Sequence, residues 1–347
     1  MEHSAWKAHV DNIGPDPARM LPGLPESMAL SYSDTRRQDR RRHELGGGRS
    51  RGGGQGSDGA NPRPPRLGQH TRWMDETEGS AALLINTCEG LESPFLEYLA
   101  GQGEKPVFGV GPLLPGTFWK SIGSVVHDRD SRPGRETNYT EDEVIQWLDS
   151  KPGGSVIYLS FGSEVGPSME EYDELAEALV ETEKSFIWVI QPGAGRPGPP
   201  ASRLYGSYEP RGLEERVGNR GLVIKGWAPQ LSILSHPSTG GFLSHCGWNS
   251  TMEAIACGTP ILAWPIRGDQ FYNAKLVVKY HHVGHMLPGI DDQLEMVKKG
   301  NIIQGINRVM DDGEVRGRAT VMRGIFEGGY PSSSAASVKA LVELISK

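Results

Sequence analysis

Apolar and polar residues in the second half of the chain alternate in the pattern of strands and helices. A short helix at 141–150 is followed by a Pro-Gly turn and by SVIYLSFGS, which predicts a buried strand. The next helix is predicted from about Met169 to Glu183, because Leu175, Ala178 and Leu179 share one face, and SFIWVI predicts the next strand. This alternation predicts a parallel sheet with helices on both faces. Ligands bind such sheets at the carboxyl ends of the strands.

A second strand, turn and helix follow further along the chain. GGFLS predicts a strand, HCGWN a tight turn, and STMEAIACG a helix that Gly258 closes. This arrangement aims backbone N–H groups and the positive end of a helix dipole at any ligand over the turn. An aromatic residue, Trp227, precedes the unit and an acidic end, Asp269 with Gln270, follows it. Together these features suit a nucleoside diphosphate sugar.

The stretch from Trp227 to Gln270 resembles the donor-binding box of plant family 1 UDP-glycosyltransferases. The match covers the first Trp, the HCGWNS core, Glu253 and the closing Asp-Gln. The resemblance implies an α/β fold of two Rossmann-like domains of the GT-B type. It also implies inverting, metal-independent transfer of glucose from UDP-glucose to a hydroxyl of a small lipophilic plant metabolite.

The resemblance assigns a donor-binding role to twelve residues. Those implied to meet uracil and ribose, with Trp227 stacking on the base, are Trp227, Ala228, Gln230 and Glu253. Those implied to lie beside the phosphates, with Gly247 leaving room for the backbone, are Ser163, His245, Gly247, Asn249 and Ser250. Those implied to face the sugar, in a combination that goes with glucose, are Trp248, Asp269 and Gln270.

Plainer interpretations of several of these residues stay open. Ser250 with Glu253 also spells the S-x-x-E capping box of a helix start. Ser163 alone would serve to cap the turn before the next helix. The remaining alternatives are core aromatics at Trp227 and Trp248, a structural histidine at His245 and a turn residue at Asp269.

The N-terminal third departs from the family's pattern. Segments 21–34 and 80–115 resemble the later half of the family's acceptor-binding domain, whereas 35–72 is rich in Arg, Gly and Pro and predicts disorder. We therefore expect an incomplete, partly disordered acceptor-side domain at 1–115, a linker at 116–140 and a donor-binding domain at 141–347. The Arg-Gly tract also resembles RNA-binding segments, although it lacks interleaved aromatic residues.

No catalytic residue is assigned from the sequence. Transfer to a hydroxyl requires a general base, and the family carries a catalytic His on a loop after its first strand. His3, His9 and His43 lie in the corresponding third of the chain, but none of them follows a buried strand. A truncated pseudoenzyme that binds UDP-sugars without transferring them therefore remains the alternative.

Length and composition restrict the number of domains, the binding partners and the kinds of site that this chain can have. The 347 residues suffice for two globular domains, and a net charge of -7 gives no basic footprint for nucleic acid or a membrane surface. The three cysteines form no C-x-x-C pair, and the longest apolar runs have the length of strands. His281, His282 and His285 are spaced closely enough for a metal site, but no nearby Asp or Glu completes one. We expect a cytoplasmic monomer without metal or cofactor, whose partners are a UDP-sugar and a small acceptor.

Overall fold

The computed structural model describes residues 23–29, 77, 79–101, 105–121, 124–126, 136–164, 166–191, 208–290 and 296–346. The chain divides into two compact units: unit 1 covers Met1–Val110 with Ala336–Lys347, and unit 2 covers Gly111–Ala335. The Arg-Gly segment predicted to be disordered, 35–72, lies outside the described residues, as do His3, His9 and His43. The domain boundaries expected at 115 and 140 stay a prediction.

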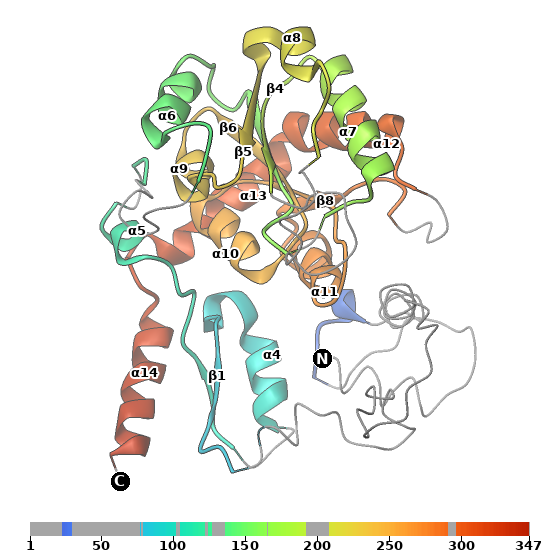
Figure 1. Cartoon of the computed structure of the whole chain (residues 1–347). Coiled ribbons are helices and arrows are strands. Elements are labelled where there is room, and N and C mark those ends of the chain that lie inside the picture. The colour runs from blue at the N-terminus through green and yellow to red at the C-terminus, as the bar shows by residue number, and fades with distance from the viewer. Residues whose placement is uncertain are drawn as a thin grey trace, which may run out of the picture. The chain divides into compact units, whose positions relative to one another are not determined.

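A parallel sheet of six strands forms the centre of unit 2 (Figure 1). In spatial order the strands are β5 (Gly221–Lys225), β4 (Ser185–Ile190), β3 (Val156–Ser160), β6 (Thr239–Ser244), β7 (Ile261–Ala263) and β8 (Gly284–Met286). Counted along the chain within unit 2, this is the order 3-2-1-4-5-6 of a doubly wound sheet. The strand order therefore reverses between β3 and β6, and ligands bind such sheets at this switch point.

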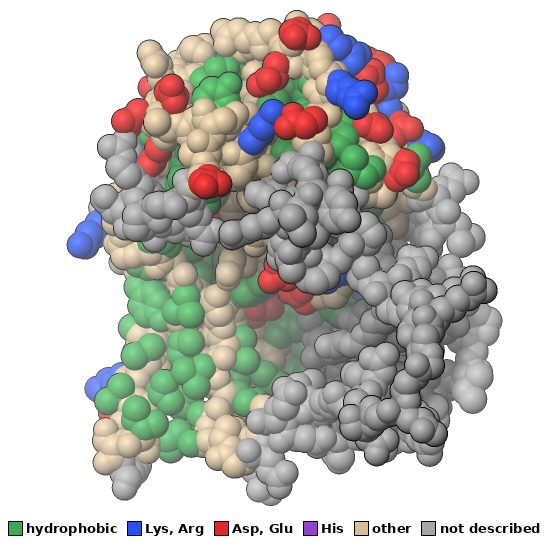
Figure 2. Space-filling view, in the orientation of Figure 1, with side chains coloured by type: hydrophobic (Ala, Val, Ile, Leu, Met, Phe, Trp, Pro, Cys, Tyr) green, Lys and Arg blue, Asp and Glu red, His purple; other side chains and the backbone are tan. Residues whose placement is uncertain are grey.

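Helices cover both faces of this sheet (Figure 1). One layer contains α7 (Met169–Glu181), α8 (Leu213–Val217) and α12 (Lys299–Asp311). The other contains α6 (Glu141–Asp149), α9 (Gln230–Ser235), α10 (Trp248–Cys257) and α13 (Gly313–Arg323). The remaining helical segments of unit 2 are α5 (Gly116–Lys120), α11 (Gln270–Lys275), η2 (Gly218–Arg220), the π-helical η3 (Leu276–Tyr280) and η4 (Gly324–Phe326). Figure 2 shows acidic and basic side chains interspersed on the face that carries α7 and α8.

Local signals set the ends of the predicted helices. The Thr140 side chain caps α6 in a reciprocal capping box with Glu143, and Ser168 caps α7 in the same way with Glu171. The helix α7 ends two residues before the predicted Glu183, because Thr182 is already extended. Gly258 closes α10 with a φ of 73°, as the sequence predicted.

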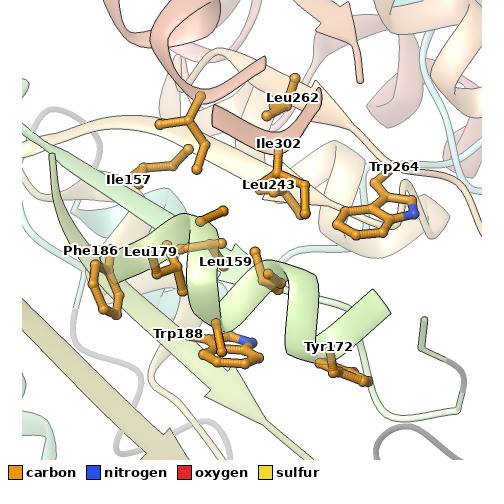
Figure 3. Packing of buried hydrophobic residues seen from close by; sticks show 14 of the residues in the cluster. Ile157, Leu159, Tyr172, Leu179, Phe186, Trp188, Leu243, Leu262, Trp264 and Ile302 are labelled. Carbon is orange, nitrogen blue, oxygen red and sulfur yellow. The ribbon is translucent and has the colours of Figure 1, made fainter. Parts of the chain in front are cut away.

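Alternate residues of the central strands fill two different cores. Ile157 and Leu159 of β3 are fully buried in the cluster that includes Leu179 of α7 and Ile302 of α12 (Figure 3). Tyr158, between them, points to the opposite face of the sheet. There its ring stacks on Phe242 of β6 at a centroid distance of 4.9 Å. The side chain of Tyr158 therefore belongs to the face that carries α9 and α10.

Unit 1 is described over a smaller part of its length. Its strands β1 (Leu83–Ile85) and β2 (Val107–Gly109) pair in parallel and are joined by α4 (Glu89–Gly101). A 3-10 turn spans Glu26–Met28, and the helix α14 (Ser332–Ile345) begins in unit 2 and continues into unit 1. Within the described parts of both units, no helix has the length and apolar character needed to cross a membrane.

Candidate functional site

A pocket of about 340 Å³ opens at the carboxyl ends of the central strands of unit 2. Residues that follow β3, β4 and β6 contribute to it, so it lies at the point where the strand order reverses. All twelve residues expected to bind the donor line this one pocket: Ser163, Trp227, Ala228, Gln230, His245, Gly247, Trp248, Asn249, Ser250, Glu253, Asp269 and Gln270. They come from segments more than 100 residues apart in the sequence.

The turn between β6 and α10 is held from both sides. Cys246 adopts a left-handed conformation with a φ of 61°, its N–H donates to Oγ of Ser244 over 3.0 Å, and its carbonyl accepts from Nδ2 of Asn273 over 2.9 Å. The thiol is fully buried, and burial raises its pKa. Cys246 therefore fixes the turn. Gly247 then forms the N-cap of α10 and, as a glycine, offers no side chain to the N–H groups of the first turn.

His245 enters the pocket as a neutral imidazole. Burial lowers the pKa of His245 to about 4, and this outweighs the raising influence of a Ser160 backbone group and the carboxylates of Asp269 and Glu164. Within the described chain, its buried Nδ1 has no hydrogen-bond partner. At neutral pH the ring can donate one hydrogen bond to an anion, but it supplies no positive charge.

The floor of the pocket contains a hydrogen-bonded group around Gln230. Nε2 of Gln230 donates to Oε2 of Glu253 over 2.6 Å and to Oγ of Ser250 over 3.1 Å. Ser250 and Glu253 are the third and sixth residues of α10, so the capping-box interpretation of this pair is wrong. A distant partner, and not the helix start, binds both side chains. Ser250 accepts from Gln230 and keeps its own hydroxyl hydrogen to donate to a ligand.

Ser163 lies on the loop after β3, where its side chain is exposed at the pocket. The helix that follows is capped by Ser168, and the alternative in which Ser163 caps the turn before that helix stays open. The aromatic residues Trp227 and Trp248 are partly buried and both line the pocket. Neither one is enclosed in the core as a packing residue.

The far end of the pocket is formed by the start of α11. Oε1 of Gln270 accepts from the backbone N–H groups of Ile266 and Arg267, each over 2.9 Å. The amide oxygen therefore fixes the turn after β7, and the amide nitrogen is the group of Gln270 that remains for a ligand. Asp269 is exposed, and its Oδ2 accepts from Nδ2 of Asn273 over 3.0 Å.

Carboxylates dominate the formal charge of the pocket lining. Glu164, Glu253 and Asp269 line it, and Glu164 pairs with Arg267 over 3.1 Å at an exposed position. The lining, all of it from described residues, contains no Lys or Arg. An anionic ligand would therefore be held by the helix start and by neutral donors.

The closely spaced histidines near β8 do not converge on a metal site. Nε2 of His285 pairs with Oδ2 of Asp312 over 2.8 Å, and burial together with His282 lowers the pKa of His281 to about 4. Throughout the described residues, no three His, Cys, Asp or Glu side chains group in a way that could hold a metal ion.

Six further residues line the pocket that the sequence did not single out: Tyr158, Ser160, Gly162, Glu164, Val189 and Gln191. All of them lie in β3 or β4 or in the residues directly after these strands. The position of a strand's carboxyl end was the available signal, because ligands bind doubly wound sheets there.

Residues 135–317 match the model of the family described as UDP-glucoronosyl and UDP-glucosyl transferase. The chain belongs to this family. UDP-glycosyltransferase 73B4 from Arabidopsis thaliana is 38% identical over 238 residues, which cover 68% of this chain and 46% of that protein. The chain spans about half the length of the curated relatives it matches.

Solved structures of plant UDP-glycosyltransferases share the fold. A UDP-glucosyltransferase from Polygonum tinctorium capable of glucosylating indoxyl is 30% identical with a TM-score of 0.60, covering 77% of this chain and 55% of its own. UGT71G1 from Medicago truncatula, complexed with UDP-glucose, is 30% identical with a TM-score of 0.61, covering 77% of this chain and 54% of its own. The predicted family and the α/β fold of the GT-B type are thereby confirmed.

Proposed function

We propose that the pocket of unit 2 binds a UDP-sugar, with UDP-glucose as the preferred donor. Uracil stacks on Trp227, the diphosphate lies over the start of α10, and the sugar faces Asp269 and Gln270. The convergence of all twelve expected residues on one pocket supports this proposal most strongly. An aromatic face stacks on any base with about 1–3 kcal/mol, and a helix start attracts phosphate.

The departing UDP would be stabilised without a metal ion. The start of α10, the imidazole of His245 and the hydroxyl of Ser250 surround the place proposed for the diphosphate. Hydrogen bonds to a charged oxygen are about twice as strong as neutral ones, so neutral donors suffice for this task. We expect no cofactor beyond the donor substrate itself.

The proposed reaction transfers glucose with inversion to a hydroxyl of a small lipophilic plant metabolite. The acceptor oxygen attacks the anomeric carbon from the face opposite UDP, the bond from that carbon to the phosphate oxygen breaks, and the acceptor proton passes to a general base. Membership of the family supports this reaction class. We also expect a cytoplasmic monomer that binds neither nucleic acid nor a membrane. The net charge of -7 supports the expectation that it binds neither of these anionic partners.

A UDP-sugar-binding pseudoenzyme is the second candidate. Among the described residues, all histidines lie in unit 2: His236, His245, His281, His282 and His285. His245, which lines the pocket, is assigned to the leaving group. The described part of the acceptor-side unit thus offers no histidine as a base.

Incubation of the purified chain with UDP-glucose and a panel of flavonoid and terpenoid aglycones distinguishes the two. Formation of a glycoside establishes the transferase. Thermal stabilisation by UDP-glucose without any product establishes the binding protein. If UDP-glucose gives neither product nor stabilisation, both proposals fail.

A further inference from the structure

A hydrogen-bonded chain of four side chains joins three elements at the floor of the pocket. The hydroxyl of Tyr158 in β3 donates to Oε1 of Gln230 in α9 over 3.1 Å. Nε2 of Gln230 in turn donates to Glu253 and Ser250 of α10. Both amide hydrogens of Gln230 are therefore used within the protein, and the amide has no donor left for a nucleotide.

We propose that Tyr158 positions Glu253 for the ribose of a UDP-sugar by locking the orientation of the Gln230 amide; this inference rests on the proposed function. A rotation of 180° about its last torsion would exchange the oxygen and the nitrogen of the amide. Only one orientation serves the carboxylate of Glu253, which accepts hydrogen bonds and cannot donate them. The Tyr158 hydroxyl, on the other side, supplies the donor that the amide oxygen needs in that same orientation.

Burial holds the Tyr158 hydroxyl, and with it the orientation of the Gln230 amide, in place. The Tyr158 residue is 1% exposed, and its ring stacks on Phe242 with an angle of 19° between the planes. The hydroxyl thus has a fixed place relative to α9. Glu253 is 3% exposed, and water is poorly placed to replace a lost donor to a buried carboxylate. A change at Tyr158 therefore reaches Glu253 through Gln230.

The test compares Tyr158→Phe with Tyr208→Phe in the full chain. Tyr208 is a matched control, because its buried ring also carries a hydroxyl that donates to a side chain, Oδ1 of Asp173 over 2.8 Å, outside the pocket. Calorimetry measures the affinities for UDP and for 2′,3′-dideoxy-UDP, which lacks the ribose hydroxyls. Tyr158→Phe is expected to weaken UDP binding about 3- to 10-fold and to leave dideoxy-UDP binding unchanged, whereas Tyr208→Phe alters neither.

Each other outcome overturns a defined part of this inference. An equal loss for both nucleotides, or no loss for either, removes the role of Tyr158 and leaves nucleotide binding intact. If the unsubstituted chain binds UDP and dideoxy-UDP equally, Glu253 does not bind the ribose hydroxyls. The inference about Tyr158 then fails, but the proposed function does not. If that chain binds neither, the proposed function fails as well. Should Tyr158→Phe not fold, Gln230→Met is expected to show the same selective loss, and an unselective loss there overturns the inference.

Discussion

The imidazole of His245 fits against the backbone of Gly247 so closely that a methyl group on Gly247 would overlap Nε2 of the ring. A methyl group on Gly162, from the loop after β3, would lie 2.7 Å from the same nitrogen. Gly247 has a φ of -58°, which any residue adopts, so space and not backbone conformation demands glycine there. Two glycines from different loops thus form the slot that holds the ring.

Gly247→Ala is expected to lower the affinity for UDP about fivefold or more, because the added methyl group must push His245 out of its place at a cost of about 1–3 kcal/mol. Calorimetric titration with UDP measures the effect. Gly317→Ala in α13 serves as the control, since a methyl group there meets no atom within 4 Å. Equal affinities of the two variants would show that the slot does not matter for binding.

The lowered pKa of His245 predicts a pH-dependent stability. The imidazole has a pKa of about 4 in the folded chain and about 6.5 in the unfolded chain. Between these values the unfolded chain binds more protons, so stability is complete above pH 6.5 and declines as the pH falls toward 4. His245→Gln removes this decline. From about pH 8 to about pH 5 the free energy of unfolding should fall by about 1–2 kcal/mol less in the variant.

Urea denaturation at the two pH values measures that difference. His281 has a similarly lowered pKa, but it is present in both chains and its contribution cancels. Identical pH dependence of the two chains would mean that His245 titrates normally in the folded state.

The two ends of the Gln270 amide have different roles. The oxygen holds the turn after β7, and the nitrogen is proposed to bind the sugar. Gln270→Glu keeps an oxygen for the N–H groups of Ile266 and Arg267 but removes the amide donor. We expect this variant to weaken binding of UDP-glucose several-fold and to leave UDP binding nearly unchanged. Gln270→Ala also loses the two backbone hydrogen bonds, which we expect to cost about 1–3 kcal/mol of stability.

Titration of both variants with UDP and UDP-glucose, together with thermal denaturation, tests this separation. If Gln270→Glu weakens both nucleotides to the same extent, the sugar does not face Gln270. A fully stable Gln270→Ala would show that the turn does not depend on the amide oxygen.

Arg220 is predicted to stabilise the end of α7 more than Arg216 does. Its guanidinium donates to the carbonyls of Leu179, Val180, Thr182 and Lys184, where α7 terminates. Arg220→Met leaves these carbonyls without that donor and should cost about 2–3 kcal/mol. Arg216→Met is the control, because Arg216 forms an exposed ion pair with Glu177 that should contribute less than about 1 kcal/mol. Equal midpoints in urea would contradict the prediction.

The elements of unit 2 could be predicted where local signals suffice. The alternation around Leu175 and the glycine at Gly258 gave α7 and the end of α10 nearly as the structure has them. Local signals misled at Ser250 and Glu253, which spell a capping box but bond to Gln230. That partner lies twenty or more residues earlier in the sequence, and only the packing of α9 against α10 brings it close.

The residues that line the pocket could also be predicted from the sequence, but the orientation of their side chains could not. The resemblance implies Gln230 at the ribose and Gln270 at the sugar, and in the structure the amide oxygen of each accepts a hydrogen bond from within the protein. The partners of Gln270 lie only three and four residues earlier in the sequence, whereas the hydrogen bond between Tyr158 and Gln230 joins β3 to α9 across 72 residues. No periodicity in the sequence encodes that long-range contact, so the sequence did not indicate Tyr158 as a pocket residue.

Calorimetric titration of the full chain and of Trp227→Ala with UDP tests most directly whether this pocket binds a uridine nucleotide. We predict saturable heat with one UDP bound per chain, and a loss of about 1–3 kcal/mol of binding free energy when the stacking face of Trp227 is removed. The absence of heat with millimolar UDP, from protein that circular dichroism shows to be folded, would contradict the proposed function.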